Sequence, residues 1–338
     1  MVNSPLKVCV AAPPSLAVSE TFIGAINAGL GDDALVIHGQ DLNFSLNGLP
    51  ISKCVQLKEQ STLRSVTALL PTFVGVRMRR KFLRPTSETE TLTSFFQDQE
   101  IDVVLAHYGT QASCLVASCK AAGVALVPHF HGFDMSVHSV LEDHTSAYKD
   151  MFRYCHRLIA VSQRMKHDMI DFGCAPDRIR VVYYSPHPTF FDVTPAYRSN
   201  NLVMAGRLTD KKAPHLTLLA FAKAAEKFPN LRLRVIGDGD LRSVCRDLID
   251  TLGISCKVDM LGAGDRNLIQ QEFGNAFAFL QHSVRAFNGD CEGTPVAILE
   301  AGASGLPVVS TKHAGIPDVI TSGAVSYTHL TLPTICSV

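Results

Sequence analysis

The sequence lacks any apolar run long enough to cross a membrane. A membrane-spanning helix needs about 20 consecutive, mostly apolar residues. The N-terminal segment MVNSPLKVCVAAPP carries one lysine and a short apolar run that ends in prolines, a pattern that predicts a first β-strand rather than a signal peptide. We therefore expect a cytoplasmic protein.

The sequence also lacks an excess of charge of either sign. Its 31 lysines and arginines equal its 31 aspartates and glutamates, so no overall field attracts nucleic acid, and we expect no nucleic-acid partner. One stretch, RMRRKFLR at Arg77–Arg84, places five basic side chains among apolar ones. Two interpretations stay open for it: a solvated helix face, or a peripheral contact with anionic lipid or a phosphate-bearing acceptor at the inner face of the cell membrane.

Cysteines and histidines at the spacing of a metal site are missing as well. The ten cysteines are scattered, and only Cys114 and Cys119 lie close together, in a segment that predicts an amphipathic helix. Two core thiols are the favoured interpretation, because no second Cys or His pair completes a metal site. We predict reduced thiols and no metal.

No G-x-G-x-x-G fingerprint follows the first predicted strand, where residues 11–20 read AAPPSLAVSE. A dinucleotide-binding turn needs those glycines for close approach of the backbone to the pyrophosphate, which excludes an NAD-dependent dehydrogenase. The later Gly237-Asp238-Gly239 lacks the third glycine. It predicts a loop near a base or a phosphate.

What the sequence does contain is a regular alternation of short β-branched runs and helical patterns over 338 residues, a length that exceeds one ordinary core. The predicted strands are VCVAAP, ALVIHG, DVVLAHYG, ALVPHFHG, LIAVS, RVVYY, NLVMAGR, LRLRVIGDG, VDMLG, AFAFLQHS and LPVVST. Apolar strands separated by helices belong to parallel sheets covered on both faces. We predict an α/β fold with two doubly wound, Rossmann-like domains, 1–185 and 200–324, joined by a linker near 184–200 and facing each other across a ligand-binding cleft.

Two basic positions follow the first strand of the second predicted domain. Gly206-Arg207 closes that strand, and Lys211-Lys212 precede a helix that begins at Pro214. Arg and Lys ahead of a helix N-terminus form a good site for a diphosphate. The alternative is a surface loop that is basic without a function.

Two glutamates separated by seven residues give the stronger signal. Glu292 lies in a loop, and Glu300 lies two turns into the helix that Pro295 begins. The flanking residues of Glu300 are apolar, so its carboxylate needs a partner such as a sugar hydroxyl.

The combination GR…KK, GDG, GD-EG-P…EA, GLPVVST and AGIP resembles the family 4 retaining glycosyltransferases. It is most similar to the enzymes of bacterial exopolysaccharide synthesis, such as those of colanic acid and amylovoran. The resemblance extends to SETFI, HFHGFD and VSQRMKHDMIDFG in the first predicted domain and covers about residues 5 to 324. It implies the GT-B fold.

The resemblance also implies roles for individual residues. Arg207 and Lys212 would hold the donor diphosphate, and Glu300 the ribose hydroxyls. Glu292 would act on the donor sugar near its reacting carbon, in a pocket lined by Gly293, Thr294 and Pro295. His131 would face the acceptor and the transferred sugar, with a core histidine as the alternative.

The expected activity is metal-independent, hexosyltransferase-type transfer from a UDP- or GDP-sugar to a lipid-linked or polysaccharide acceptor, without a cofactor. Past Gly323 the chain departs from the family pattern and ends in VSYTHLTLPTICSV. We expect a truncated second domain with a non-native tail at 325–338. The alternative is an inactive nucleotide-sugar-binding protein derived from such an enzyme.

Overall fold

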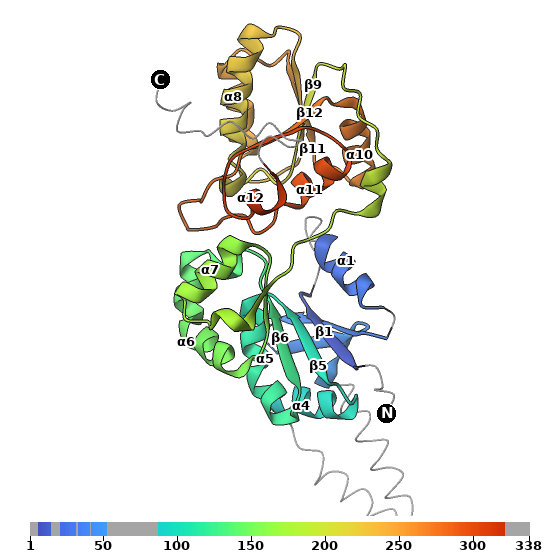
Figure 1. Ribbon diagram of the computed structural model, residues 1–338, viewed down its shortest axis with the longest axis vertical. Helices are drawn as coiled ribbons and strands as arrows, with labels where there is room; N and C mark the ends of the chain where they lie inside the picture. The colour runs from blue at the N-terminus through green and yellow to red at the C-terminus, as the bar shows by residue number, and fades with distance from the viewer. Residues whose placement is uncertain (1–5, 15–20, 32, 41, 53–86, 322–338) are drawn as a thin grey trace, which may run out of the picture. The chain divides into compact units, whose positions relative to one another are not determined.

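The computed structural model describes residues 6–14, 21–31, 33–40, 42–52 and 87–321 (Figure 1). Arg77–Arg84 and the tail at 325–338 lie outside these residues, so the interpretations offered for them stay predictions. Among the described residues, no helix combines the length and the apolar character that a membrane crossing requires.

The chain divides into two compact units. The first comprises Met1–Phe130, His144–Ile159 and Gly173–Arg180, and the second comprises His131–Asp143, Ala160–Phe172 and Val181–Val338. Two short segments that lie between parts of the first unit in the sequence therefore belong to the second unit. The domain boundaries expected from the sequence stay a prediction.

The first sheet has eight strands among the described residues. Their order is β4 (Leu49–Pro50), β3 (Asn43–Leu46), β2 (Leu35–Gln40), β1 (Val8–Ala12), β5 (Val103–His107), β6 (Ala125–His129), β7 (Leu158–Ala160) and β8 (Ile179–Val181). Strand β1 pairs in parallel with β2 and β5, and β6 pairs in parallel with β5 and β7. The connections contain α1 (Thr21–Gly29), α4 (Glu88–Asp98), α5 (Gly109–Ala122), α6 (His138–Tyr154) and α7 (Gln163–Asp171). The α/β fold predicted from the sequence is confirmed.

An antiparallel extension of this sheet was not predicted. Strand β3 pairs antiparallel with β2 and with β4, and only Asn47-Gly48 connects β3 to β4. Both residues have positive φ angles, 51° and 78°. A two-residue Asn-Gly turn with this backbone is the preferred connection of a tight hairpin, so the signal was present in the sequence.

Local sequence sets several helix ends in the first half of the chain. Ser87 and Glu90 form a capping box at the start of α4, in which each side chain accepts from the other's backbone N–H. Gly123 ends α5 in the left-handed conformation, with φ of 74°. The Ser162 side chain caps α7 by accepting from the Met165 N–H at 3.1 Å.

In the part of the chain that the structure describes, the second sheet has five strands. Their order is β11 (Val258–Gly262), β10 (Arg232–Ile236), β9 (Asn201–Ala205), β12 (Ala278–Gln281) and β13 (Val308–Ser310), and their pairings are parallel. Its helices are α8 (Pro214–Lys227), α9 (Arg242–Thr251), α10 (Arg266–Asn275), α11 (Val296–Ala303) and α12 (Ile316–Val319).

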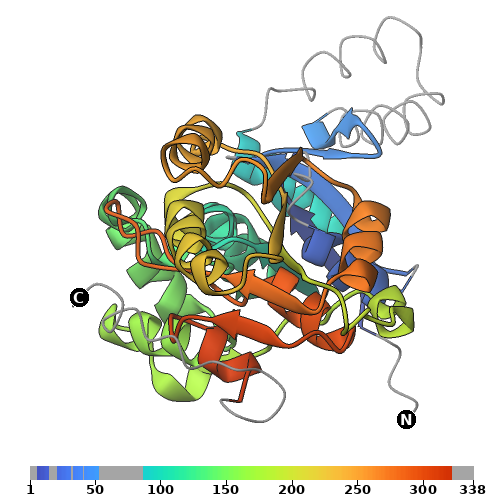
Figure 2. The ribbon, with the colours of Figure 1, turned by 90° about the horizontal axis from the view of Figure 1, so that it is seen from above.

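Helices cover both faces of this sheet (Figure 2). On β9, Leu202 and Met204 pack with α8 and α9, while Val203 and Ala205 pack with α10 and α11. Successive side chains of a strand point to opposite faces, so an apolar run such as NLVMA is buried on both. This is the doubly wound arrangement that the sequence predicted.

The segment before β9 also contributes to the second core. Phe190, in a short 3-10 helix at Pro188–Asp192, is fully buried, and its ring lies 5.8 Å from that of Phe273, centroid to centroid.

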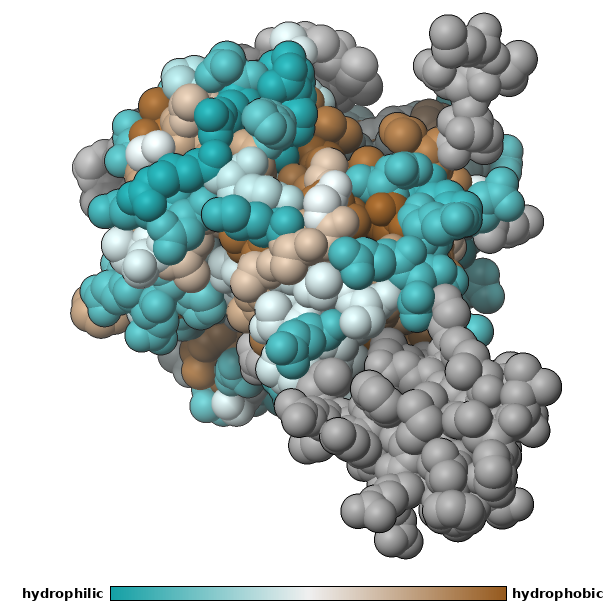
Figure 3. Space-filling view, turned by 90° about the horizontal axis from the view of Figure 1, so that it is seen from below, coloured by the Kyte–Doolittle hydropathy of each residue, from teal (hydrophilic) through white to brown (hydrophobic). Residues whose placement is uncertain are grey.

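On the face of the molecule drawn in Figure 3, hydrophilic residues predominate and hydrophobic ones are scattered among them. That mixture is usual for a globular protein surface.

Candidate functional site

The candidate site is built where strands of the second sheet end. Three loops begin there: residues 206–213 after β9, residues 282–295 after β12, and residues 311–315 after β13. In an open parallel sheet the carboxyl ends of the strands form the ligand-binding edge. The loops contain most of the site residues predicted from the sequence: Arg207, Lys212, Glu292, Gly293, Thr294 and Pro295.

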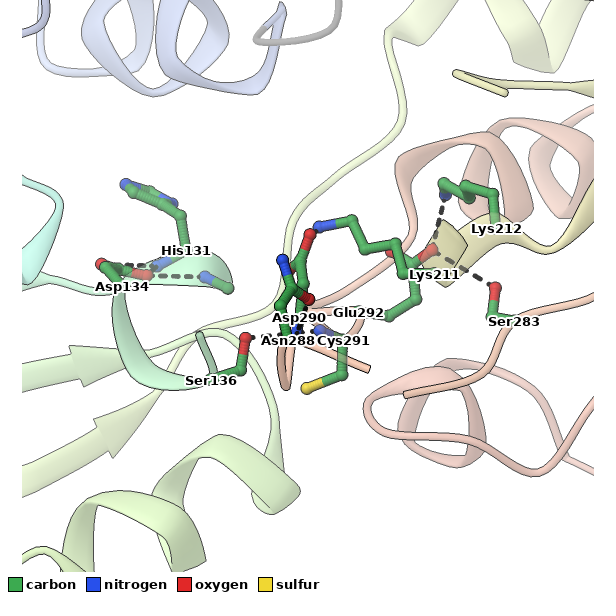
Figure 4. Close-up of polar contacts among 11 residues, drawn as sticks. His131, Asp134, Ser136, Lys211, Lys212, Ser283, Asn288, Asp290, Cys291 and Glu292 are labelled. Atoms are coloured by element: carbon green, nitrogen blue, oxygen red, sulfur yellow. Dashed lines mark hydrogen bonds and ion pairs between the residues drawn. The ribbon is translucent and has the colours of Figure 1, made fainter. Parts of the chain in front are cut away.

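Two lysine–carboxylate pairs join the first loop to the second (Figure 4). The Lys212 ammonium lies 2.8 Å from Oε1 of Glu292, and the Lys211 ammonium lies 3.0 Å from Oδ1 of Asp290. The side chains of Lys212 and Glu292 are only 13% and 7% exposed. At that burial an unpaired charge would be costly, so each group stabilises the other's charged form.

The ionisation of Glu292 follows from these contacts. Burial alone would raise its pKa, but the positive charges of Lys212 and Lys211 and hydrogen bonds from Lys212 and Ser283 outweigh burial. The Ser283 hydroxyl donates to Oε1 of Glu292 at 3.3 Å. The pKa of Glu292 therefore lies below its ordinary value, and the site presents a buried carboxylate beside two ammonium groups.

Residues His131–Ser136 form one side of the same site, because this segment packs against the loop that carries Glu292. The Asp134 carboxylate accepts from the backbone N–H of His131 at 3.0 Å and of Gly132 at 2.8 Å. The Ser136 hydroxyl accepts from the Cys291 N–H at 3.3 Å. These bonds fix the backbone that carries His131.

The His131 ring is held from the side by Tyr184. Its Nδ1 lies 2.5 Å from the Tyr184 hydroxyl, and the two rings are nearly parallel, with centroids 5.9 Å apart. His131 as a whole residue is 8% exposed. Tyr184 thus fixes the orientation of the imidazole, and no local sequence pattern predicts that contact.

The turn at Gly293 and Thr294 fits tightly against neighbouring backbone. A Cβ on Gly293 would lie 2.5 Å from the carbonyl oxygen of His131, which leaves no room for a side chain. The Thr294 hydroxyl donates to the carbonyl of Val161. Pro295 is the N-cap of α11. The sequence predicted that the helix begins at Pro295, and in the structure it begins one residue later, at Val296.

The structure brings His131, Lys212, Glu292, Gly293 and Thr294 into one contact network. The Arg207 side chain is exposed and makes no ion pair with any described residue. Glu300 lies in the second turn of α11, where burial raises its pKa to about 7 although Arg266 acts in the opposite direction. The functional roles of all these residues stay predictions.

Several residues of the network received no role from the sequence. They are Asp134, Ser136, Tyr184, Ser283 and Asp290. The sequence contains a signal for the lysine–carboxylate contacts. Two adjacent lysines, Lys211 and Lys212, correspond to two carboxylates at alternate positions, Asp290 and Glu292. The other contacts depend on tertiary packing.

The turn after Lys212 is strained. Ala213 is buried and has φ of 39° and ψ of 54°, the left-handed conformation, immediately before Pro214 at the start of α8. A residue with a Cβ in this conformation costs about 1–2 kcal/mol relative to a relaxed backbone. The strain lies at the residue that follows Lys212.

We expect Ala213→Gly to raise the free energy of unfolding by about 0.5–1 kcal/mol, because glycine adopts this conformation without strain while losing more chain entropy on folding. Urea denaturation measures the change. The matched control is Ala222→Gly within α8, which should lower the free energy by about 1 kcal/mol. A loss of stability in Ala213→Gly would contradict the assigned strain.

Two family models of glycosyltransferases match the two halves of the chain. The model for glycosyl transferases group 1 matches residues 189–329, and the model for glycosyltransferase family 4 matches residues 57–184.

The chain is similar in sequence to glycosyltransferases whose names refer to exopolysaccharide synthesis. The chain is 32% identical over 229 residues to WcaL of Escherichia coli, described as a colanic acid biosynthesis glycosyltransferase. It is 30% identical over 224 residues to the amylovoran biosynthesis glycosyltransferase AmsK of Erwinia amylovora. Each match covers 65% of this chain and 55% of the relative. The chain thus spans little more than half the length of these relatives.

Solved structures agree on the fold. HepE of Anabaena, in complex with UDP and glucose, superposes with a TM-score of 0.68 at 18% identity, covering 95% of this chain and 84% of that one. The apo form of the lipopolysaccharide outer core galactosyltransferase WaaB gives 0.63 at 19% identity, covering 98% and 88%. At such identities the likeness establishes architecture alone.

Proposed function

We propose that this chain, which matches the models for glycosyl transferases group 1 and glycosyltransferase family 4 and has the GT-B fold, transfers a sugar from a nucleotide-sugar donor to a lipid-linked or polysaccharide acceptor in exopolysaccharide synthesis. Transfer proceeds with retention of the anomeric configuration. The donor is a UDP- or GDP-sugar, and the site works at the inner face of the cell membrane.

The buried pairing of Lys212 with Glu292 carries this proposal. Breaking the bond between a sugar and a diphosphate leaves negative charge on the diphosphate and positive charge on the sugar. A carboxylate 2.8 Å from an ammonium group presents both complementary charges at one place. The lysine neutralises the departing diphosphate, and the carboxylate lies toward the sugar.

The remaining roles follow the same division of charge. Arg207 joins Lys212 on the diphosphate, since its side chain is exposed and makes no ion pair with a described residue. Glu300 accepts from the ribose hydroxyls, because a half-buried carboxyl in an apolar helix gains from such donors. We propose that these cationic side chains, rather than a metal ion, stabilise the leaving group.

The donor sugar and the acceptor contact the other residues of the site. The backbone of Gly293, Thr294 and Pro295 lines the sugar pocket beside Glu292. His131 faces the transferred sugar and the acceptor hydroxyl, with its ring oriented by Tyr184.

Calorimetry of the purified chain with UDP, GDP and ADP tests the donor class. Binding of one nucleoside diphosphate, followed by its release from the matching nucleotide-sugar, supports transfer, and NMR of the product's anomeric proton tests retention. Binding without any turnover would identify an inactive nucleotide-sugar-binding protein. A folded chain that binds none of the three would contradict the proposal.

A further inference from the structure

Phe287 stands out among the exposed apolar side chains of the described residues. It is 102% exposed relative to an extended reference, whereas the other large apolar side chains described as exposed range from 38% to 68%. Scattered apolar residues are normal on a protein surface. A phenyl ring without any protein cover on either face is not, because burying even part of it would be favourable.

The loop that presents this ring is held rigidly. The Ala286 N–H donates to the Asp290 carbonyl at 2.8 Å, and the Gly289 N–H donates to the Ala286 carbonyl at 2.9 Å. The Asn288 carbonyl accepts from the His138 N–H at 2.9 Å. Asp290 is bound in turn to the Lys211 ammonium. The exposure of Phe287 is therefore built into an ordered loop.

The same loop leads directly into the candidate site. Figure 4 shows Asn288, Asp290 and Cys291 beside Ser136, and Glu292 follows toward Lys212. A Cβ on Gly289 would lie 2.4 Å from the Ser136 carbonyl oxygen, so the loop contacts the segment that carries His131 without space to spare. Phe287 thus precedes, by five residues, the carboxylate that we assign to the donor sugar.

We propose that Phe287 is a stacking platform for a pyranose ring of the acceptor saccharide. The inference rests on the proposed function and extends it to the acceptor. The face of an aromatic ring carries negative potential, and it attracts the positively polarised C–H groups on one face of a sugar. The residues flanking the ring, Arg285 and Asn288, are exposed, and they supply hydrogen-bonding groups for the sugar hydroxyls at its edge.

A lipid surface fits this arrangement less well. Stable insertion into a bilayer interface requires an extended apolar face or several anchors. Phe287 is instead a single exposed ring, with the polar residues Arg285 and Asn288 near it in the chain. A sugar ring matches both the size and the mixed polarity of the position.

The absence of tryptophan from the chain provides a direct test. Phe287→Trp introduces a single tryptophan, whose emission can be excited selectively, and keeps an aromatic face. Titration with methyl glycosides of glucose, galactose and mannose and with lactose and cellobiose, in the presence of the bound nucleoside diphosphate, should change its emission with at least one sugar. Phe287→Ala should weaken the binding of that sugar about tenfold, measured by saturation-transfer NMR.

Phe228→Trp is the matched control. Phe228 is 63% exposed at the opposite end of α8, about 20 Å along the helix from the site, and its tryptophan should not respond to sugars. Nucleoside diphosphate binding should be equal in wild type, Phe287→Trp and Phe287→Ala, and its absence from wild type would mean that the proposed function fails by itself. If the nucleotide binds but no sugar changes the emission, or if only phosphatidylglycerol vesicles change it, the stacking proposal is overturned.

Discussion

Replacing Lys212 with alanine is expected to weaken nucleoside diphosphate binding about 100-fold and to lower the free energy of unfolding by about 3 kcal/mol. The loss of binding reflects the missing charge-assisted contact to the diphosphate. The loss of stability has a separate cause, because Glu292, 8% exposed, would keep a buried negative charge without its closest cation. Calorimetry and urea denaturation measure the two effects independently.

A second substitution separates these causes. Adding Glu292→Gln to Lys212→Ala removes the unpaired buried charge, so the double variant should recover most of the lost stability while nucleotide binding stays weak. Lys223→Ala, on the exposed face of α8, should change neither quantity. Unchanged nucleotide affinity in folded Lys212→Ala would remove this lysine from the proposed diphosphate site.

Much of the fold was predictable because its signals are local. All eleven predicted strands occur in the two sheets. In an α/β protein, a short apolar β-branched run between two helices usually forms a parallel strand that is buried on both faces. The β3–β4 hairpin was missed for a related reason. Its strands, NFSL and LP, are too short to show an apolar β-branched run, and the Asn47-Gly48 turn is a signal of hairpins rather than of parallel strands.

The candidate site was predictable only in part. The spacing of Glu292 and Glu300 and the position of Lys212 are properties of a loop and the helix after it, so they could be read from the sequence. The bond between Lys211 and Asp290 joins residues 79 positions apart. It exists because β9 and β12 are neighbours in the sheet, and strand order is not a local property.

The assignment of His131 illustrates the same limit. The sequence suggested a functional histidine in HGFD, but not what would hold it. The Asp134 carboxylate lies close in sequence and fixes the backbone of His131, a contact that an aspartate three residues away readily makes. Tyr184 reaches the ring from 53 positions away, and only the three-dimensional structure reveals it.

Glu300 gives the second large prediction, because its pKa of about 7 makes both stability and binding depend on pH. Burial raises this pKa above the ordinary value of 4.5, so the folded chain holds a proton that the unfolded chain releases between about pH 5 and 7. The free energy of unfolding attributable to this group therefore falls as pH rises through that interval. Above pH 7 the half-buried Glu300 carboxyl is mostly ionised, and this buried charge lowers the free energy of unfolding.

Glu300→Gln should accordingly raise the free energy of unfolding by about 2 kcal/mol at pH 8 and leave it nearly unchanged at pH 5, where the wild-type carboxyl is already neutral. Urea denaturation at the two pH values measures the difference. The exposed Glu226→Gln in α8 serves as a control and should have no effect at either pH. A gain of equal size at both pH values would show that ionisation of Glu300 is not its cause.

The same carboxylate should control the donor. If ribose hydroxyls donate to ionised Glu300, the affinity for a UDP- or GDP-sugar should fall about tenfold from pH 8 to pH 6, because the ionised fraction falls by that factor around a pKa of 7. A nucleotide-sugar is the right probe, since its diphosphate diester does not titrate in this range. Glu300→Gln should bind it weakly at pH 8 and without pH dependence. Full affinity in that variant would separate the buried carboxyl from the ribose and leave its raised pKa as a property of the α11 helix alone.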